Sequence, residues 1–266
     1  MLKNQRKRIL LLTDVFGGVG GAERNIIQLM TGIDKGRFDV HVACFAPGKL
    51  ADNMRNQGFS VSNLDGKGIY TISGLKNLAF LRRLVTEKEI SLIVTYHESS
   101  DFYGLVLSRI CNIPIISSRR DMGFKTKLHH QLAYRFVGRF FDAVIAVSDA
   151  VKKEVVKRHW FPEKDIVTIY NAIDSIGYRE THDGITLKKK LGVDPRYPVV
   201  GMIANIHKIK GYDYFLRAAG IINNCSHNVQ FLIAGNETKD SDFTISGLKK
   251  HAEEIGISQR LRFFDG

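Results

Sequence analysis

Near its N-terminus the sequence reads RILLLTDVFGGVGGAER (residues 8–24), an apolar run followed by closely spaced glycines. The apolar run predicts a strand buried on both faces, and the periodicity after the glycines predicts a helix from Ala22 to Gly32. Glycines let a backbone approach a ligand closely, and free N–H groups at a helix start favour an anion. The segment therefore predicts a strand–loop–helix unit that binds a phosphate or a sugar. The alternative is that the glycines only turn a tight corner.

Two common phosphate-binding loops are excluded for this segment. The dinucleotide fingerprint G-x-G-x-x-G fails, because counting from Gly18 and Gly20 places Glu23 where the third glycine belongs. The P-loop pattern fails as well, because no Gly-Lys-Ser or Gly-Lys-Thr follows. The glycine loop is therefore neither a dinucleotide fingerprint nor a P-loop.

Strands and helices alternate along the rest of the chain. Mostly apolar strands separated by amphipathic helices are typical of a parallel sheet that helices cover on both faces. The sequence therefore predicts an α/β fold built from Rossmann-like, doubly wound parallel sheets. The first series has candidate strands at residues 8–12, 39–44, 91–96, 114–118, 143–147 and 166–170, and helical patterns fall between most of them, such as those at 22–32, 75–87 and 149–158.

A polar stretch separates this series from a second one. We expect residues 1–175 to form a first domain, residues 176–197 a linker with one short helix, and residues 198–266 the first part of a second domain. The length of 266 residues, at about 150 residues per domain, agrees with two domains. The second series comprises strands at 199–204, 229–234 and 260–264 and helices at 212–223 and 245–255.

The charge of the chain points to an anionic partner. It has 39 basic and 27 acidic residues, a net charge of +12, which suits phosphorylated small molecules, anionic lipid or nucleic acid. A nucleic-acid partner is not expected, because the sequence has no helix-turn-helix, zinc-finger or RNP pattern. The three cysteines lie far apart and form no CxxC pair, so we expect a reducing, cytoplasmic location.

A second strand–loop–helix unit opens the second domain. The strand at 199–204 is followed by NIHKIKG (residues 205–211) and then by a helix. A lysine and a glycine at a helix start can hold a diphosphate, although Lys-Gly is also a common dipeptide in loops. The loop is therefore a candidate phosphate site.

Several motifs occur in an order and spacing that resemble a known family. They are GGAE (20–23), FDAVIAVS (141–148), IYNAID (169–174), the block from Gly201 to Gly211, and FLIAG (231–235). Together they resemble the retaining GT-B glycosyltransferases of family 4, also called glycosyltransferase group 1, over nearly all of the chain. The resemblance implies two Rossmann-like domains, of which the C-terminal one holds a nucleotide sugar and the N-terminal one supplies most of the acceptor site.

The resemblance also implies an activity. It is the transfer of a sugar, with retention at the anomeric carbon, from a UDP- or GDP-linked donor to a polysaccharide or lipid-linked acceptor. No protein nucleophile, metal or cofactor is implied besides the donor substrate. Lys210 and Gly211 match the family's diphosphate-binding positions, and Asn205 stands where the family often has an arginine. Gly20 and Gly21 match the glycine loop beside the reacting centre and are predicted to belong to the catalytic site.

The acceptor side departs from the family at one position. Arg120 stands where many members carry a histidine, and arginine binds phosphate or carboxylate in a bidentate way, so an acceptor with an anionic group would suit it. We predict catalytic roles for Arg120 and His97, and acceptor-binding roles for Arg119 and Glu98. The alternatives are that Arg119 and Arg120 pair with Asp121 or another surface acid, and that His97 is structural.

A different interpretation is a nucleotide-sugar-binding module without catalysis, or an inactive fragment. The family's paired glutamates, an E-x7-E segment that binds the donor sugar and ribose, lie beyond the strand at 260–264, and the sequence given ends before them. We therefore expect the second domain and its donor site to be incomplete within these residues. Donor-dependent sugar transfer would distinguish the two interpretations.

Two further features leave alternatives open. Asp240-Ser241-Asp242 is a D-x-D pair of the kind that holds a metal in other transferases, but its polar surroundings favour a solvated loop and helix N-cap, so no metal site is predicted. A basic stretch from Arg119 to Phe141 interleaves cations with large apolar side chains. It can lie on an anionic membrane, at its inner face, or pack its apolar side on its own sheet.

Overall fold

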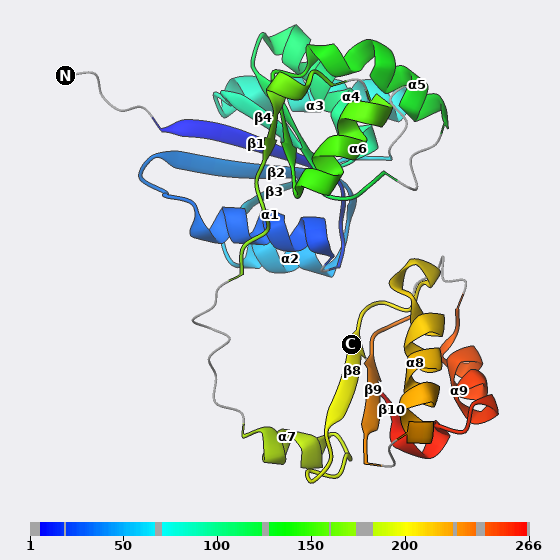
Figure 1. Cartoon of the computed structure of the whole chain (residues 1–266). Coiled ribbons are helices and arrows are strands. Elements are labelled where there is room, and N and C mark those ends of the chain that lie inside the picture. Colours follow the sequence, from blue (N-terminus) through cyan, green and yellow to red (C-terminus); the bar gives the residue numbers. More distant parts are fainter. Residues whose placement is uncertain are drawn as a thin grey trace. The chain divides into compact units, whose positions relative to one another are not determined.

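The structure is a computed structural model of the chain, and it describes residues 6–18, 20–66, 71–123, 128–159, 161–173, 183–225, 228–237 and 243–264. The chain divides into two compact units, Met1–Ile173 and Asp174–Gly266 (Figure 1). Each unit has its own sheet and its own hydrophobic core.

Within the described residues, the first unit is built on a seven-stranded parallel sheet with the order β3-β2-β1-β4-β5-β6-β7. The central position of β1 explains why its run from Ile9 to Leu12 is buried on both faces. The strands are β1 (Lys7–Phe16), β2 (Phe38–Pro47), β3 (Ser60–Asn63), β4 (Leu92–Thr95), β5 (Ile115–Arg119), β6 (Ala143–Ala146) and β7 (Ile166–Thr168).

Helices cover both faces of this sheet. They are α1 (Gly21–Gly32), α2 (Lys49–Asn56), α3 (Ile72–Glu87), α4 (Glu98–Cys111), α5 (Leu128–Val137) and α6 (Asp149–His159), with the 3-10 helices η1 (Gly138–Phe140) and η2 (Glu163–Asp165).

The two sets of helices pack on alternate residues of the strands. α1 and α2 lie on one face of the sheet, and α3 to α6 lie on the other (Figure 1). Ile9 and Leu11 of β1 belong to the core under α1 and α2, whereas Leu10 and Leu12 belong to the core under α3 to α6. Successive residues of a strand point to opposite faces, so one apolar run supplies both cores. The predicted doubly wound α/β fold is confirmed.

The second unit has a smaller parallel sheet with the order β10-β9-β8. Tyr212, Leu216, Leu248 and Ala252 pack from its helices onto the sheet through a single buried cluster. Its elements are α7 (Gly184–Lys190), β8 (Val199–Ile203), η4 (Lys208–Lys210), α8 (Tyr212–Cys225), β9 (Gln230–Ala234), α9 (Ile245–Glu254), η5 (Ser258–Arg260) and β10 (Leu261–Phe264). The short helix predicted between the two series is α7.

The strand order identifies where a ligand would bind in the first unit. The chain moves outward from β1 to β2 and β3 on one side and then returns to β4 on the other side. In open parallel sheets, ligands bind at such a switch point, outside the carboxyl ends of the strands. β1 and β4 end at Phe16 and Thr95, so the segments that follow them are expected to line a site. No helix among the described residues is long and apolar enough to cross a bilayer.

Candidate functional site

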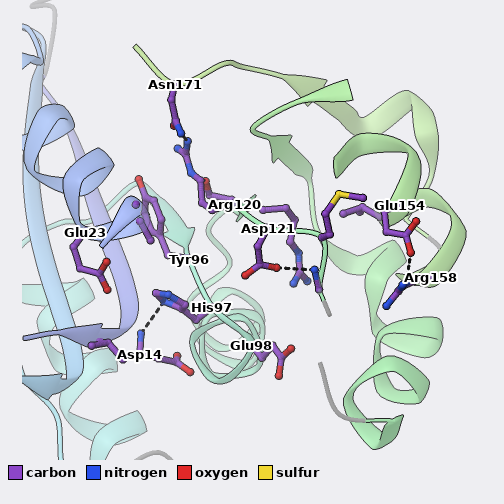
Figure 2. A pocket seen from close by; sticks show the side chains of 18 residues that line it. Asp14, Glu23, Tyr96, His97, Glu98, Arg120, Asp121, Glu154, Arg158 and Asn171 are labelled. Atoms are coloured by element: carbon purple, nitrogen blue, oxygen red, sulfur yellow. Dashed lines mark hydrogen bonds and ion pairs between the residues drawn. The ribbon is translucent and has the colours of Figure 1, made fainter. Parts of the chain in front are cut away.

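A pocket of about 650 Å³ lies at this switch point (Figure 2). Most of the predicted site residues of the first unit line it, namely Gly21, His97, Glu98, Arg119 and Arg120. They come from the start of α1 and from the ends of β4 and β5, which the parallel sheet brings to one edge. The other lining residues are Asp14, Val15, Ala22, Glu23, Tyr96, Ser118, Asp121, Met122, Gly123, Glu154, Val155, Arg158 and Asn171.

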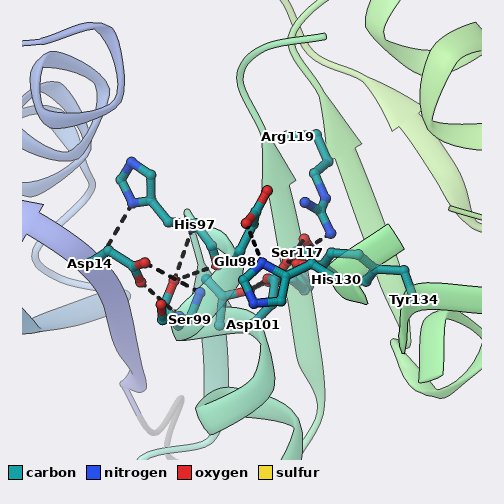
Figure 3. Close-up of polar contacts among 12 residues, drawn as sticks. Asp14, His97, Glu98, Ser99, Asp101, Ser117, Arg119, His130 and Tyr134 are labelled. Atoms are coloured by element: carbon teal, nitrogen blue, oxygen red, sulfur yellow. Dashed lines mark hydrogen bonds and ion pairs between the residues drawn. The ribbon is translucent and has the colours of Figure 1, made fainter. Parts of the chain in front are cut away.

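Asp14, at the end of β1, fixes the start of α4 (Figure 3). Its Oδ1 accepts a hydrogen bond of 2.7 Å from the Ser100 N–H, and its Oδ2 accepts one of 3.2 Å from the Ser99 N–H. Ser100 Oγ accepts the His97 N–H at 2.9 Å. A carboxylate at a helix N-terminus satisfies free N–H groups and is favoured by the helix dipole. The cap thus comes from a strand distant in sequence, and it holds the His97–Ser100 turn at the pocket.

His97 is oriented by the same turn. Its Nδ1 accepts a hydrogen bond of 3.3 Å from the Asp14 N–H and lies 3.0 Å from Thr13 Oγ1. When Nδ1 accepts, a neutral imidazole carries its proton on Nε2. No partner of Nε2 lies within the part of the chain that the structure describes. His97 therefore offers an Nε2–H donor to a ligand in the pocket, which agrees with its predicted place in the site.

Glu98 is held by a histidine of α5. Its Oε2 lies 2.6 Å from His130 Nδ1, and both side chains are about half-buried (Figure 3). The His130 ring also tilts against Phe102, with the ring centroids 5.6 Å apart. One carboxylate oxygen of Glu98 is thus engaged with His130, and its predicted acceptor-binding role stays a prediction.

Arg119 is committed to a buried network. Its Nη2 lies 2.7 Å from Asp101 Oδ2, and its guanidinium sits 4.4 Å from the centroid of the Tyr134 ring. Asp101 also accepts hydrogen bonds from Thr95 Oγ1, from Ser117 Oγ at 3.1 Å and from Tyr134 Oη at 2.8 Å (Figure 3).

Electrostatics keep the Arg119 guanidinium charged. Burial alone would lower the pKa of Arg119, but the Asp101 carboxylate and the Tyr134 phenol outweigh it and raise the pKa of the guanidinium. The acid that pairs with Arg119 is therefore a buried one, rather than the neighbouring Asp121. Arg119 still borders the pocket with its side chain 11% exposed, and its predicted acceptor contact stays a prediction.

Arg120 has a different environment. Nε donates to Ser118 Oγ at 2.9 Å, Nη1 donates to Asn171 Oδ1 at 2.8 Å, and Nη2 donates to Asn25 Oδ1. Its guanidinium lies 5.7 Å from the centroid of the Tyr96 ring. Burial lowers the pKa of Arg120, and Tyr96 partly offsets this effect. Within the described residues no carboxylate forms an ion pair with Arg120, so the alternative of pairing with Asp121 is not observed.

The glycine loop lies beside Glu23, and of its two predicted site residues Gly21 lines the pocket while Gly20 adjoins the Glu23 carboxylate. This glutamate is 8% exposed, lines the pocket, and has no hydrogen-bond or ion-pair partner in the described part of the chain. A Cβ on Gly20 would lie 2.4 Å from Glu23 Oε2, so glycine at this position leaves room for the carboxylate. Nothing lies within 4 Å of the place where a Cβ on Gly21 would project. The sequence showed the glycines but did not single out Glu23.

The second unit presents the predicted donor loop at its surface. Asn205 and Lys210 are exposed, and Lys210 has no ion-pair partner in the described residues. Gly211 has φ of +78°, a conformation that favours glycine, and it turns η4 into α8. Tyr212 Oη donates to the Ala204 carbonyl at 2.6 Å, which fixes the loop to the end of β8. The loop therefore places a free cation next to a helix N-terminus.

Gly235, in the FLIAG motif, allows this loop to form. A Cβ at this position would lie 1.8 Å from the Ala204 carbonyl oxygen, so any other residue would displace the backbone. The Gly235 N–H donates to the Phe264 carbonyl at 3.0 Å. Glycine is thus required where the ends of β8, β9 and β10 converge beside the donor loop.

A metal site finds no support in the residues that the structure covers. Among them, no group of three or more His, Cys, Asp or Glu side chains is arranged to hold an ion. The sequence pair Asp240 and Asp242 lies outside the described residues. The expectation of a metal-free site therefore stays a prediction.

Comparison with known proteins places the chain in a family. The sequence model of Glycosyltransferase Family 4 matches residues 19–175. The chain belongs to Glycosyltransferase Family 4. It is 27% identical over 148 residues to the alpha-D-kanosaminyltransferase of Streptomyces kanamyceticus, a match covering 51% of this chain and 38% of that protein. It is also 27% identical over 122 residues to a D-inositol 3-phosphate glycosyltransferase of Mycobacterium sp. (strain KMS), covering 46% and 27%. The chain thus matches well under half the length of these relatives.

Solved structures show that this family-4 chain has the GT-B type of fold. Anabaena HepE in complex with UDP and glucose superposes with a TM-score of 0.81 at 22% identity, over 98% of this chain and 70% of that one. The sucrose-phosphate synthase of Thermosynechococcus elongatus superposes with a TM-score of 0.74 at 14% identity, over 97% and 70%. At these identities the likeness establishes the fold, with its two parallel α/β units.

Proposed function

We propose that this family-4 chain transfers a sugar from a nucleotide-diphosphate donor, UDP- or GDP-linked, to a saccharide or lipid-linked acceptor. One observation carries the proposal: a pocket at the switch point of the first sheet, lined by His97 and Arg120, in a chain whose second unit exposes Lys210 at a helix start. The complex of Anabaena HepE with UDP and glucose, a protein of the same fold, supports the choice of donor class.

The donor side works through charge stabilisation. As the bond from the anomeric carbon to the diphosphate breaks, negative charge grows on the diphosphate oxygen. Lys210 and the N–H groups at the start of α8 are already in position to stabilise that charge as it develops. Asn205 supplies a neutral hydrogen bond where an arginine would supply a second charge. Because these groups suffice for the charge, we propose transfer without a metal ion.

The acceptor side works through orientation. The Nε2–H of His97 and the unpaired carboxylate of Glu23 reach the same pocket and can hold the hydroxyl groups of an acceptor sugar. Because Gly20 and Gly21 carry no side chains, the space beside them stays open. Retention at the anomeric carbon is proposed on the resemblance to retaining family-4 enzymes.

The surface of α5 and η1 supports a lipid-linked acceptor. Leu128, Leu132, Phe136 and Phe140 recur every four residues and are 72%, 46%, 71% and 43% exposed. Tyr134 of the same helix is fully buried, so one face of α5 packs on the sheet while another presents apolar side chains to solvent. The alternative of packing on the sheet therefore holds for one face of α5, and membrane contact of the other face is part of the proposal.

Cations border this apolar stripe. Arg135 and Arg139 are exposed beside it, and the guanidinium groups of Arg109 and Arg139 lie 5.8 Å and 5.0 Å from the Phe140 ring centroid. Apolar side chains flanked by arginines fit the boundary between acyl chains and anionic headgroups. We propose that the stripe rests on the inner face of an anionic membrane, where a lipid-linked acceptor would be found.

The test is donor-dependent transfer with analysis of the product. A protein containing both units is incubated with UDP- and GDP-sugars and with acceptor extracts, and the anomeric configuration of the product is read by NMR. We expect transfer with the donor configuration preserved. Tight binding of the donor without any transfer would instead favour the nucleotide-sugar-binding module, and an inverted product would refute retention.

A further inference from the structure

We infer that Arg120 forms an anion-binding subsite, which receives a carboxylate or phosphate group carried by the acceptor. The inference rests on the proposed function and names the acceptor's chemical class. It is drawn from the partners of Arg120, from the charges around it, and from its position in the pocket.

The hydrogen bonds of Arg120 hold its guanidinium without neutralising it. A guanidinium has five N–H donors. Three of them are engaged by Ser118, Asn171 and Asn25, and Arg120 also forms a side-chain hydrogen bond with Tyr96, so none of its partners is a carboxylate. At least one donor therefore remains. The three anchors come from β5, from the segment after β7 and from α1, so the planar group is held from several sides before a ligand arrives.

The other arginines that line the pocket already have carboxylate partners, whereas Arg120 has none among the described residues. Arg119 pairs with Asp101, and Arg158 pairs with Glu154. Within the described residues, Arg120 is the pocket arginine that lacks a carboxylate partner. A half-buried charge without a counterion is unfavourable, because it has lost part of its hydration. An anionic ligand would supply the missing partner.

Apart from Glu23, the acids that line the pocket have other partners. Both oxygens of Asp14 accept N–H groups of α4, and Glu98 contacts His130. Asp121 Oδ1 accepts the Gly123 N–H at 2.7 Å, and its side chain lies away from the end of Arg120 that meets Asn171 (Figure 2). Glu23 is unpaired and lies beside Gly20, so the pocket has a cationic position at Arg120 and an anionic one at the glycine loop.

The geometry of the site selects the ligand chemistry. Arginine binds planar carboxylates and phosphates through parallel N–H donors, and such charge-assisted hydrogen bonds are stronger than neutral ones. A neutral sugar in the same pocket would leave the Arg120 charge unmatched. The acceptor is therefore expected to be an acidic sugar, with a uronate carboxylate, or a phosphorylated one.

The experiment compares three probes of similar size, namely D-glucuronate, D-glucose 6-phosphate and D-glucose. Binding to the full chain is measured by isothermal titration or saturation-transfer NMR at constant ionic strength, because screening changes charge-dependent affinity. We expect at least one anionic sugar to bind at least tenfold more tightly than glucose. A preference for glucuronate would show that the subsite receives a carboxylate of the acceptor, and a preference for glucose 6-phosphate would show that it receives a phosphate.

Variants then assign the preference to Arg120. Arg120→Gln should remove the preference to within twofold, and Arg120→Lys should retain part of it because the charge remains. Arg82→Ala is the matched control, since it removes an exposed arginine of α3 outside the pocket. Melting temperatures check that each variant folds. If Arg120→Gln does not fold, the inference is tested by the anionic preference of the wild type and by whether Arg120→Lys retains part of that preference.

Three results would overturn the inference. They are equal or undetectable binding of all three sugars to the wild type, an anionic preference that survives Arg120→Gln, and complete loss of preference in a folded Arg120→Lys. UDP binding and donor-dependent transfer are measured on the same preparations. If they persist while the anionic preference is absent, the subsite is wrong and the proposed transferase function stands.

Discussion

Asp101 Oδ2 lies 2.7 Å from Arg119 Nη2, and this ion pair is buried behind the pocket that Arg120 enters. Two adjacent arginines of one sequence motif thus have different partners. The residue of β5 closer to the core joins a network with Asp101 and Tyr134, and the next residue faces the pocket with only neutral partners. This difference indicates a stabilising role for Arg119 and is the basis of the binding role that we propose for Arg120.

The buried pair should be essential for stability. Replacing Asp101 with Asn, or Arg119 with Met, leaves one charge buried without its partner, and we expect a loss of about 3–5 kcal/mol in the free energy of unfolding. Urea unfolding measures it. Arg83→Ala, which breaks the exposed pair with Glu87, is the control and should have a far smaller effect. Unchanged stability in both buried variants would show that the network does not hold the fold.

His41 should make the first unit less stable in mild acid. It lies between Ser60 and Ser62 of β3, and burial lowers its pKa from 6.5 to about 4, with a further contribution from Lys88. The unfolded chain binds a proton at pH 6.5, whereas the folded chain binds it only near pH 4. Stability is therefore complete above pH 6.5 and falls by about 3 kcal/mol as the pH drops through this window.

A matched variant isolates this effect. His41→Asn keeps hydrogen-bonding capacity but does not titrate, so its stability relative to wild type should improve steadily from pH 7 to pH 4. Urea unfolding at a series of pH values gives the difference. A constant difference across this range would mean that His41 titrates alike in the folded and unfolded chains.

Chelation should leave transfer intact. Lys210 and the start of α8 take the place of a cation on the diphosphate, so activity in excess EDTA is expected to stay within about twofold of the untreated rate, less than about 0.5 kcal/mol. The rate is compared before and after dialysis against the chelator. Complete loss that Mn²⁺ restores would move the chemistry to a metal site, with Asp240 and Asp242 as the first candidates.

The stripe on α5 should direct binding to anionic vesicles. Leu132→Ser with Phe136→Ser should weaken partitioning onto vesicles of mixed phosphatidylcholine and phosphatidylglycerol at least tenfold, because each buried side chain of this size contributes about 1.5–3 kcal/mol. Sedimentation with vesicles measures the fraction of protein that partitions onto them. Ile221→Ser, at a 67% exposed position of α8, is the matched control. Equal binding of wild type and double variant, or equal binding to pure phosphatidylcholine vesicles, would contradict this proposal.

The periodicity of the sequence was enough for most of the fold. The run from Ile9 to Leu12 predicted a strand covered on both faces, because only such a strand buries consecutive apolar residues. Some elements were not predicted, among them β3 and α2. β3 reads SVSN and α2 reads KLADNMRN, so neither has the apolar content that marks a strand or helix in isolation. Both depend on packing against β2 and its core, which is a tertiary effect.

The site was predictable where a residue follows a strand directly. The sequence placed His97, Glu98, Arg119 and Arg120 at strand ends, and they line one pocket because the ends of parallel strands share one edge of a sheet, while their roles stay predictions. Asp14 also follows the first strand, and that position could have identified it. Glu23 offered no such signal, because a glutamate in a first helical turn is ordinary. Its significance comes from burial without a partner, and from a Gly20 that leaves space for it.

The central claim is that the exposed Lys210 stabilises the leaving diphosphate of a nucleotide sugar. The most direct test is kcat/KM for sugar transfer by Lys210→Ala in a protein containing both units, beside Lys250→Ala, which removes an exposed lysine of α9. We predict a loss of about 2–4 kcal/mol in transition-state stabilisation for Lys210→Ala, unchanged melting temperature, and a near wild-type rate for Lys250→Ala. A Lys210→Ala rate within about threefold of wild type, equivalent to less than about 1 kcal/mol, would contradict the account.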